Sequence, residues 1–132
     1  MNKQKNDRPA ASLGAMESRF ADIIWGSAPL PSGELVKLCR EELGWQKSTT
    51  YTMLRRLCQK GLFQNQDGLV SALLSKEEFL ARQSEDFLES NFAGSLPRFL
   101  AAFSSRQRLS EADVAELEQL IASAREAGGE EQ

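Results

Sequence analysis

The sequence predicts a mainly α-helical protein with one small β-hairpin, arranged as an N-terminal domain and a helical C-terminal module. Two observations lead to this fold class. Apolar residues recur at three- and four-residue spacing over most of the chain, and an Asp-Gly pair between two short apolar-containing runs marks a hairpin. The length of 132 residues allows one or two small globular units.

The first three predicted elements are short helices. The first covers about residues 15–26, the second begins at the N-cap Ser32 and ends at Gly44, and the third runs from about 47 to 60. Gly61 occupies the C′ position that ends the third helix. The apolar face of the first helix consists of Met16, Phe20, Ile23 and Ile24.

The pattern changes after the third helix. The runs LFQNQ and LVSALL flank Asp67-Gly68, which predicts two antiparallel strands joined by a tight turn. Three helices followed by a small hairpin are the element order of a winged helix, a variant of the helix-turn-helix. We therefore predict a winged helix-turn-helix domain over residues 13–74, preceded by a polar, disordered arm over residues 1–12.

Helical periodicity returns at Ser75, where a capping box with Glu78 begins a helix that extends to about residue 91. Two more helices are predicted, one in the run LPRFLAAF and one after Ser110. We expect these helices to form a dimerisation module over residues 75–127, followed by a disordered tail over 128–132.

The C-terminal module is expected to need a second copy of the chain. Three short helices of about 50 residues in total hide too little surface to be stable alone. We therefore predict a homodimer. The apolar residues expected at the dimer contact are Phe79, Phe87, Leu96, Phe99, Leu100, Phe103, Val114, Leu117, Leu120 and Ile121.

Charge differs between the two halves of the chain. Residues 1–61 contain ten Lys and Arg against six acids, a balance of +4, whereas residues 62–132 contain six against thirteen, a balance of −7. Two interpretations explain this difference in charge equally well. One is chance segregation of solvated charge. The functional interpretation is a module that binds a polyanion, joined to one that does not.

The third helix carries the candidate DNA-binding residues. Its exposed face has hydroxyls first and cations later, with no carboxylate from Lys47 to Lys60. Ser and Thr can reach base edges or phosphates, and Arg can bind phosphate or guanine through two hydrogen bonds. An ordinary solvated helix mixes charges of both signs, so this face favours a nucleic acid. The predicted DNA-binding residues are Lys47, Ser48, Thr49, Tyr51, Thr52, Arg55 and Arg56, although Tyr51 could equally cover the edge of the core.

Composition argues against several other functions. The sequence has no His, and Cys39 and Cys58 lie on apolar faces without a ligand set, so no metal site and no cofactor are expected. No nucleophile–base pair, phosphate loop or convergent carboxylate pair is present, so we do not expect an enzyme. No apolar run approaches the roughly 20 residues of a membrane-spanning helix, and no secretory signal is evident, so we expect a cytoplasmic protein without membrane insertion.

Several motifs occur in a recognisable order. SRFADIIW, LPSGELV, STTYTMLRRLCQKG and LLSKEEF are followed by NFAGSLPRFLAAF and LSEADVAEL. Together they resemble the penicillinase repressor family of bacterial transcriptional regulators. The resemblance implies a homodimeric repressor that reads a dyad operator in double-stranded DNA and controls β-lactam-resistance or related stress genes. It also implies that the major groove receives Ser48, Thr49, Thr52 and Arg56, with Lys47, Tyr51 and Arg55 near the DNA backbone.

The chain departs from the family pattern at three places. The family's wing usually has an Arg and two Tyr after its turn glycine, whereas here no basic residue lies between Leu62 and Leu74. Members that respond to antibiotics are cleaved at an Asn-Phe bond through the pathway of a membrane sensor protease. The aligned bond here is Ala102-Phe103, and Asn91-Phe92 lies earlier. The cysteine cluster of the copper-responsive members is missing.

A function of a different class is also open. Winged helices serve as protein-interaction modules too, the net charge is −3, and the hairpin lacks cations. The alternative is therefore an interaction adaptor without strong DNA binding, which predicts negligible retention on DNA at about 0.1 M salt. A DNA-binding repressor predicts retention under the same conditions.

Overall fold

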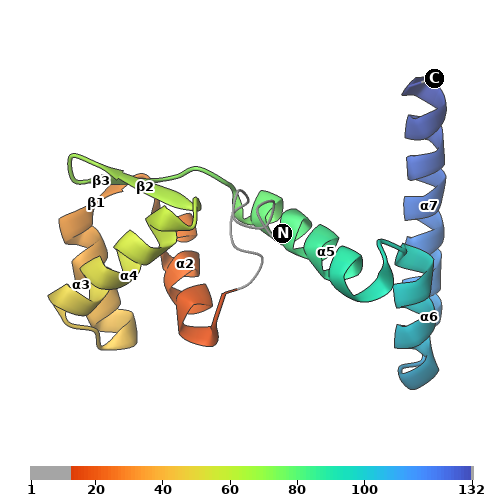
Figure 1. The fold of residues 1–132 in the computed structure, drawn as a ribbon, viewed down its shortest axis with the longest axis horizontal. Coiled ribbons are helices and arrows are strands. Elements are labelled where there is room, and N and C mark those ends of the chain that lie inside the picture. The colour runs from red at the N-terminus through yellow and green to blue at the C-terminus, as the bar shows by residue number, and fades with distance from the viewer. Residues whose placement is uncertain (1–12, 132) are drawn as a thin grey trace.

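The computed structural model describes residues 13–131, and the arm predicted over residues 1–12 lies outside them. Figure 1 shows an N-terminal part in which helices pack against a small sheet, and three C-terminal helices that extend away from it. The elements in chain order are α2 (Ala15–Ser27), β1 (Leu30–Pro31), α3 (Ser32–Leu43), α4 (Lys47–Gln59), β2 (Phe63–Gln66), β3 (Leu69–Ala72), α5 (Lys76–Phe92), α6 (Leu96–Arg106) and α7 (Glu111–Glu131). This architecture confirms the predicted fold class, a winged helix followed by a helical part.

The ends of the N-terminal helices follow their local sequence. Helix α3 ends at Gly44 with φ 70°, and α4 is followed by Gly61 with φ 88°, both in the left-handed region that favours glycine. One prediction at a helix end is wrong. Ser32 is the first residue of α3 rather than its N-cap, a position that Pro31 takes.

The sheet has three strands in the order β1-β3-β2. The predicted hairpin is present, with Asp67 at φ 54° and Gly68 at φ 88° in the two-residue turn between β2 and β3. The sequence did not predict β1, in which Leu30 pairs with Val70 across an antiparallel ladder. A two-residue strand ending in proline has almost no local pattern, and proline is tolerated there because β1 is an edge strand.

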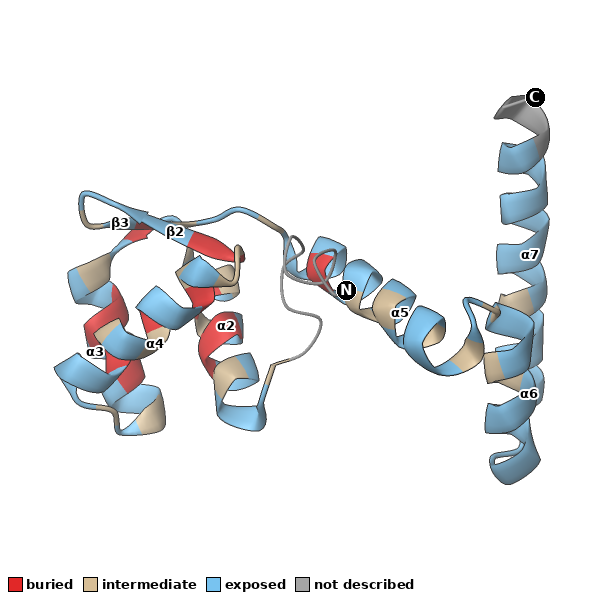
Figure 2. Cartoon of the chain, viewed as in Figure 1, coloured by how far each residue is buried: buried red, intermediate tan, exposed pale blue. Residues whose placement is uncertain are grey.

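The buried residues belong to the part of the chain from α2 to the first turn of α5 (Figure 2). The core contains apolar side chains from every helix and strand of the winged helix, and Phe79 from α5. Both tryptophans pack against it, with the Trp45 ring 5.2 Å from that of Phe20 and the Trp25 ring 5.3 Å from that of Phe63. The fully buried core residues include Phe20, Ile24, Leu35, Cys39, Leu57, Leu62, Phe63 and Val70.

The C-terminal helices have no comparable core of their own. None of the described residues after Phe79 is buried, and the described part of α7 is almost entirely exposed (Figure 2). The break before α6 is placed as predicted, with Ala93 and Gly94 at positive φ. Helix α7 continues to Glu131, so the tail predicted from residue 128 is wrong over that stretch. Helical hydrogen bonding therefore extends across Gly128, despite the low helix propensity of glycine.

Candidate nucleic-acid interface

The outer side of α4 presents a continuous polar surface, which we call the α4 polar face. Its six side chains are all exposed, and none comes from an acidic residue. They are Lys47, Ser48, Thr49, Thr52, Arg55 and Arg56. The structure thus displays to solvent six of the seven residues predicted from the sequence to bind DNA.

Packing on the opposite side of α4 orients this face. Thr50, Leu54 and Leu57 are buried against the core, which turns the intervening residues outward. Thr50 Oγ1 has no hydrogen-bond partner in the described part of the chain. Burial raises the pKa of the Cys39 thiol on α3, and the nearby Thr50 hydroxyl offsets part of that rise. Cys39 on α3 and Thr50 on α4 are both fully buried.

Tyr51 differs from the rest of the predicted set. It is half-buried, and its hydroxyl lies 2.9 Å from Ser32 Oγ at the start of α3. This hydrogen bond joins the first turn of α3 to α4. It supports a packing role for Tyr51, which the sequence left open beside a DNA contact.

The cations at the end of α4 pair with Glu17, an acidic residue of another helix. The periodicity of α4 alone could not reveal this pairing. Glu17 of α2 lies 3.2 Å from Lys60 Nζ through Oε1 and 3.7 Å from Arg56 Nη1 through Oε2. Its side chain is only 14% exposed, whereas that of Arg56 is 54% exposed. Among residues 13–131, Lys47 and Arg55 have no such carboxylate partner within salt-bridge distance. These two cations are thus the least neutralised on the α4 polar face.

Glu17 makes a testable contribution to stability. The backbone N–H of Gly14, 3.0 Å away, lowers the pKa of its carboxyl below the ordinary 4.5, burial opposes this, and Lys60 and Arg56 lower it further. A carboxyl whose pKa is lower in the folded than in the unfolded protein stabilises the fold at pH values above its unfolded pKa. That stability is lost as the pH falls through its folded pKa. We expect Glu17→Gln to lower the free energy of unfolding at pH 7 by about 1–2 kcal/mol in urea titrations.

The matched control for this change is Glu116→Gln, which removes an exposed carboxylate from α7. The difference in stability between wild type and Glu17→Gln should shrink as pH falls below 4.5. A difference that stays constant from pH 7 down to pH 3 would contradict the assigned role of the Glu17 charge.

The hairpin presents neutral polar groups rather than cations. Gln64 Nε2 donates to Ser71 Oγ across the strands at 3.2 Å, and the Gly68 N–H donates to Asn65 Oδ1 at 3.0 Å. Leu69 is 49% exposed near the turn. The hairpin therefore adds no positive charge to the surface formed by α4.

The residues predicted for dimerisation divide into two groups. Phe79 does not fit the prediction, because it is only 4% exposed and packs in the winged-helix core. The spacing of apolar residues along α5 could not reveal which of them faces its own domain. The other nine are partly or well exposed on α5–α7: Phe87, Leu96, Phe99, Leu100, Phe103, Val114, Leu117, Leu120 and Ile121.

Aromatic rings connect α5 to α6 within one chain. Phe87 lies 6.1 Å from Phe99 between ring centroids, and Phe92 lies 5.7 Å from the same ring. Phe103 continues the cluster at 6.3 Å from Phe99. Phe92 was not among the residues predicted for dimerisation, although it lies five residues from Phe87 in the same helix. The cluster is half-open to solvent, since Phe87 is 49% and Phe103 44% exposed.

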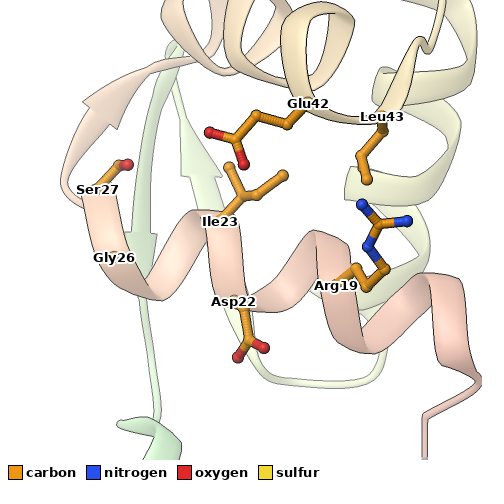
Figure 3. A pocket seen from close by; sticks show the side chains of 7 residues that line it. All are labelled: Arg19, Asp22, Ile23, Gly26, Ser27, Glu42 and Leu43. Carbon is orange, nitrogen blue, oxygen red and sulfur yellow. The ribbon is translucent and has the colours of Figure 1, made fainter.

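One hollow on the winged helix does not gather reactive groups. It measures about 400 Å³ and is lined by α2 and the end of α3. Figure 3 shows Glu42 and Arg19 extending beside it, while Asp22 points away. Asp22 is paired with Lys76 Nζ at 2.9 Å. Across the described residues, no three His, Cys, Asp or Glu side chains are grouped so as to hold a metal ion. The same residues contain no helix that is long and apolar enough to cross a membrane.

Comparison with known proteins identifies related sequences. Residues 13–123 match the family model described as penicillinase repressor. The penicillinase repressor of Bacillus licheniformis is 26% identical over 109 residues, which cover 80% of this chain and 85% of that protein. An uncharacterised 16.5 kDa protein from the ptsI 3′ region of Latilactobacillus sakei is 26% identical over 103 residues, covering 75% of this chain and 70% of that protein.

Proposed function

Since the chain belongs to the penicillinase repressor family, whose members are DNA-binding transcriptional repressors and not enzymes, we propose that it acts as a homodimer that reads a dyad operator. In this proposal each α4 polar face enters the major groove of one half-site. The hydroxyls of Ser48, Thr49 and Thr52 contact base edges or phosphates, and Lys47 and Arg55 contact phosphates. Arg56 contributes less, because Glu17 shares its charge.

The observation that carries this proposal is the composition and exposure of the α4 polar face. A solvent-exposed helix surface gains stability from i,i+4 pairs of opposite charge. This surface has no acid of its own, and Lys47 and Arg55 have no acidic neighbour within salt-bridge distance in the described chain. Phosphates of a nucleic acid are suitable counter-charges for such a surface.

The exposed apolar surface of α5–α7 supports the homodimer. Leu120 is 65% and Ile121 55% exposed on α7, and Leu96 is 59% exposed on α6. A second copy could bury these side chains in a symmetric interface. Two-fold symmetry then places the half-sites about 34 Å apart, or a multiple of that distance.

The relative from Bacillus licheniformis supports a proposal for the regulated genes. Because that protein is named a penicillinase repressor, we include β-lactam-resistance or related stress genes among the proposed targets. A membrane sensor protease pathway is then the proposed source of the signal. Cleavage at Ala102-Phe103 in α6 would separate the last turn of α6 and all of α7 from the winged helix.

The direct test is selection of duplexes from random DNA by the purified full chain. The proposal expects recovery of a sequence with dyad symmetry, followed by a gel shift on that duplex at about 0.1 M salt. Failure to retain DNA at that salt concentration would contradict the proposal. It would instead favour the protein-interaction adaptor, to which a hairpin without cations is also suited.

Arg55→Gln is expected to weaken binding to the selected duplex and to lower the slope of log affinity against log salt by about one. The reason is that one phosphate contact, with its released counterion, is lost. The control is Arg98→Gln, which removes an exposed cation from α6, away from α4. Equal salt slopes for wild type and Arg55→Gln would show that this guanidinium does not contact phosphate.

A further inference from the structure

The first turn of α5 is anchored in the winged helix by several independent contacts. Phe79 is 4% exposed, and its ring lies 5.7 Å from that of Trp25 in α2. The indole Nε1–H of Trp25 donates to the Leu74 carbonyl at 2.9 Å. Lys76 Nζ reaches Asp22 at 2.9 Å, an exposed pair of minor energetic weight. We call Trp25, Leu74 and Phe79 the α5 joint.

The segment before α5 is equally constrained. The Leu73 N–H donates to the Leu62 carbonyl at 2.8 Å, which extends the strand ladder toward the helix. Ser75 and Glu78 then form a reciprocal capping box, with bonds of 3.0 and 2.8 Å. No flexible linker therefore separates the sheet from α5. The direction in which α5 leaves the winged helix is set by the joint.

Beyond Phe79, α5 continues without a break to Phe92, and the turn at Ala93 and Gly94 then leads to α6. Helix α5 has 17 residues, and its far end packs against α6 through Phe87, Phe92 and Phe99. A helix of this length spans about 25 Å. Within residues 13–131, Figure 1 shows α5 as the only element that connects the winged helix to α6 and α7.

We propose that the α5 joint determines which half-site spacing the dimer accepts, with Phe79 and Trp25 as positioning residues. This inference rests on the proposed function, because it requires a dimer formed by the C-terminal helices and two winged helices on one duplex. A tilt of about 10° at the joint would displace the far end of α5 by about 4 Å. That exceeds the rise of one base pair, about 3.4 Å. A rigid joint therefore allows the dimer to bind only one spacing of the two half-sites. A loosened joint allows it to bind half-sites at several spacings.

The test uses the full chain and dyad duplexes that the wild type has selected from random DNA. Each duplex is remade with one base pair added or removed between the half-sites. For the wild type we expect affinity to fall by about tenfold or more, because the second half-site can no longer be engaged. For Phe79→Ala this penalty should shrink to about threefold or less, while affinity for a single half-site stays unchanged.

Leu80→Ala is the matched control, since Leu80 is the next residue of α5 and is 45% exposed. It should keep the full spacing penalty. Trp25→Phe is the second variant in case Phe79→Ala does not fold, because it keeps a core ring but removes the bond to Leu74. Circular dichroism melts identify which variants are folded.

The outcomes separate this inference from the proposed function. A folded Phe79→Ala dimer that keeps the wild-type penalty overturns the role of the joint, as does Trp25→Phe if it is the folded variant. If the wild type itself retains no dyad duplex, the proposed function fails and the spacing role fails with it.

Discussion

Replacing Ile121 with Asp is expected to turn the dimer into monomers and to lower affinity for the selected dyad duplex by about 100-fold or more. Ile121 is 55% exposed on α7, so the change should leave the fold of one chain intact. In the proposed dimer the new carboxylate would be buried without a partner, at a cost of several kcal/mol. Loss of the dimer removes the gain from binding both half-sites at once.

Sedimentation velocity and a gel shift measure the two parts of this expectation. Gln119→Asp adds the same charge at an exposed, polar position of α7 and serves as the control. If Ile121→Asp still sediments as a tight dimer, the α7 surface is not the dimer contact.

Replacing Thr52 with Glu is expected to reduce binding to the selected duplex by about 100-fold. Thr52 lies at the centre of the α4 polar face and is exposed, so the substitution should not disturb the core. A carboxylate there would face phosphates and the electronegative edges of bases, and like-charge contact at an interface costs several kcal/mol. The loss should be largest at low salt, where electrostatic repulsion is least screened.

Thr52→Gln is the matched variant, because Gln has the size of Glu without its charge. We expect it to bind several-fold better than Thr52→Glu, and fluorescence anisotropy titrations of both variants isolate the effect of the charge. If the two variants bind equally at low salt, α4 does not approach DNA at this position.

Local features of the fold could be predicted because their causes lie within a few residues. The hairpin turn depends on Asp67 and Gly68, which adopt the two positive φ angles that such a turn needs. The start of α5 depends on Ser75 and Glu78, three residues apart. Helical periodicity likewise identified the exposed side of α4, since burial repeats at the helical period.

Other features depend on residues far apart in the chain and could not be predicted in this way. The two-residue strand β1 forms because Leu30 pairs with Val70 of β3. Glu17 accepts a hydrogen bond from Lys60, which lies 43 positions later in the chain. Trp25 donates one to the carbonyl of Leu74, which lies 49 positions later. The α4 polar face therefore appeared free of acidic neighbours in the sequence, although Glu17 of α2 neutralises part of the cationic end of α4. The apolar pattern of α5 made Phe79 look equivalent to Phe87, although the two face different surroundings.

The sequence by itself determined the order of the helices and the hairpin, the hairpin turn, the cap of α5, and the exposed hydroxyls and cations of α4, because each follows from short-range backbone and periodicity rules. Only the tertiary structure decided that Tyr51 bonds to Ser32 and that Phe79 belongs to the core of its own winged helix. The physical reason is that helical spacing specifies which side of a helix is apolar but not which surface will cover it. For Phe79 that surface is the Trp25 ring, placed there by a helix some 50 residues earlier in the chain.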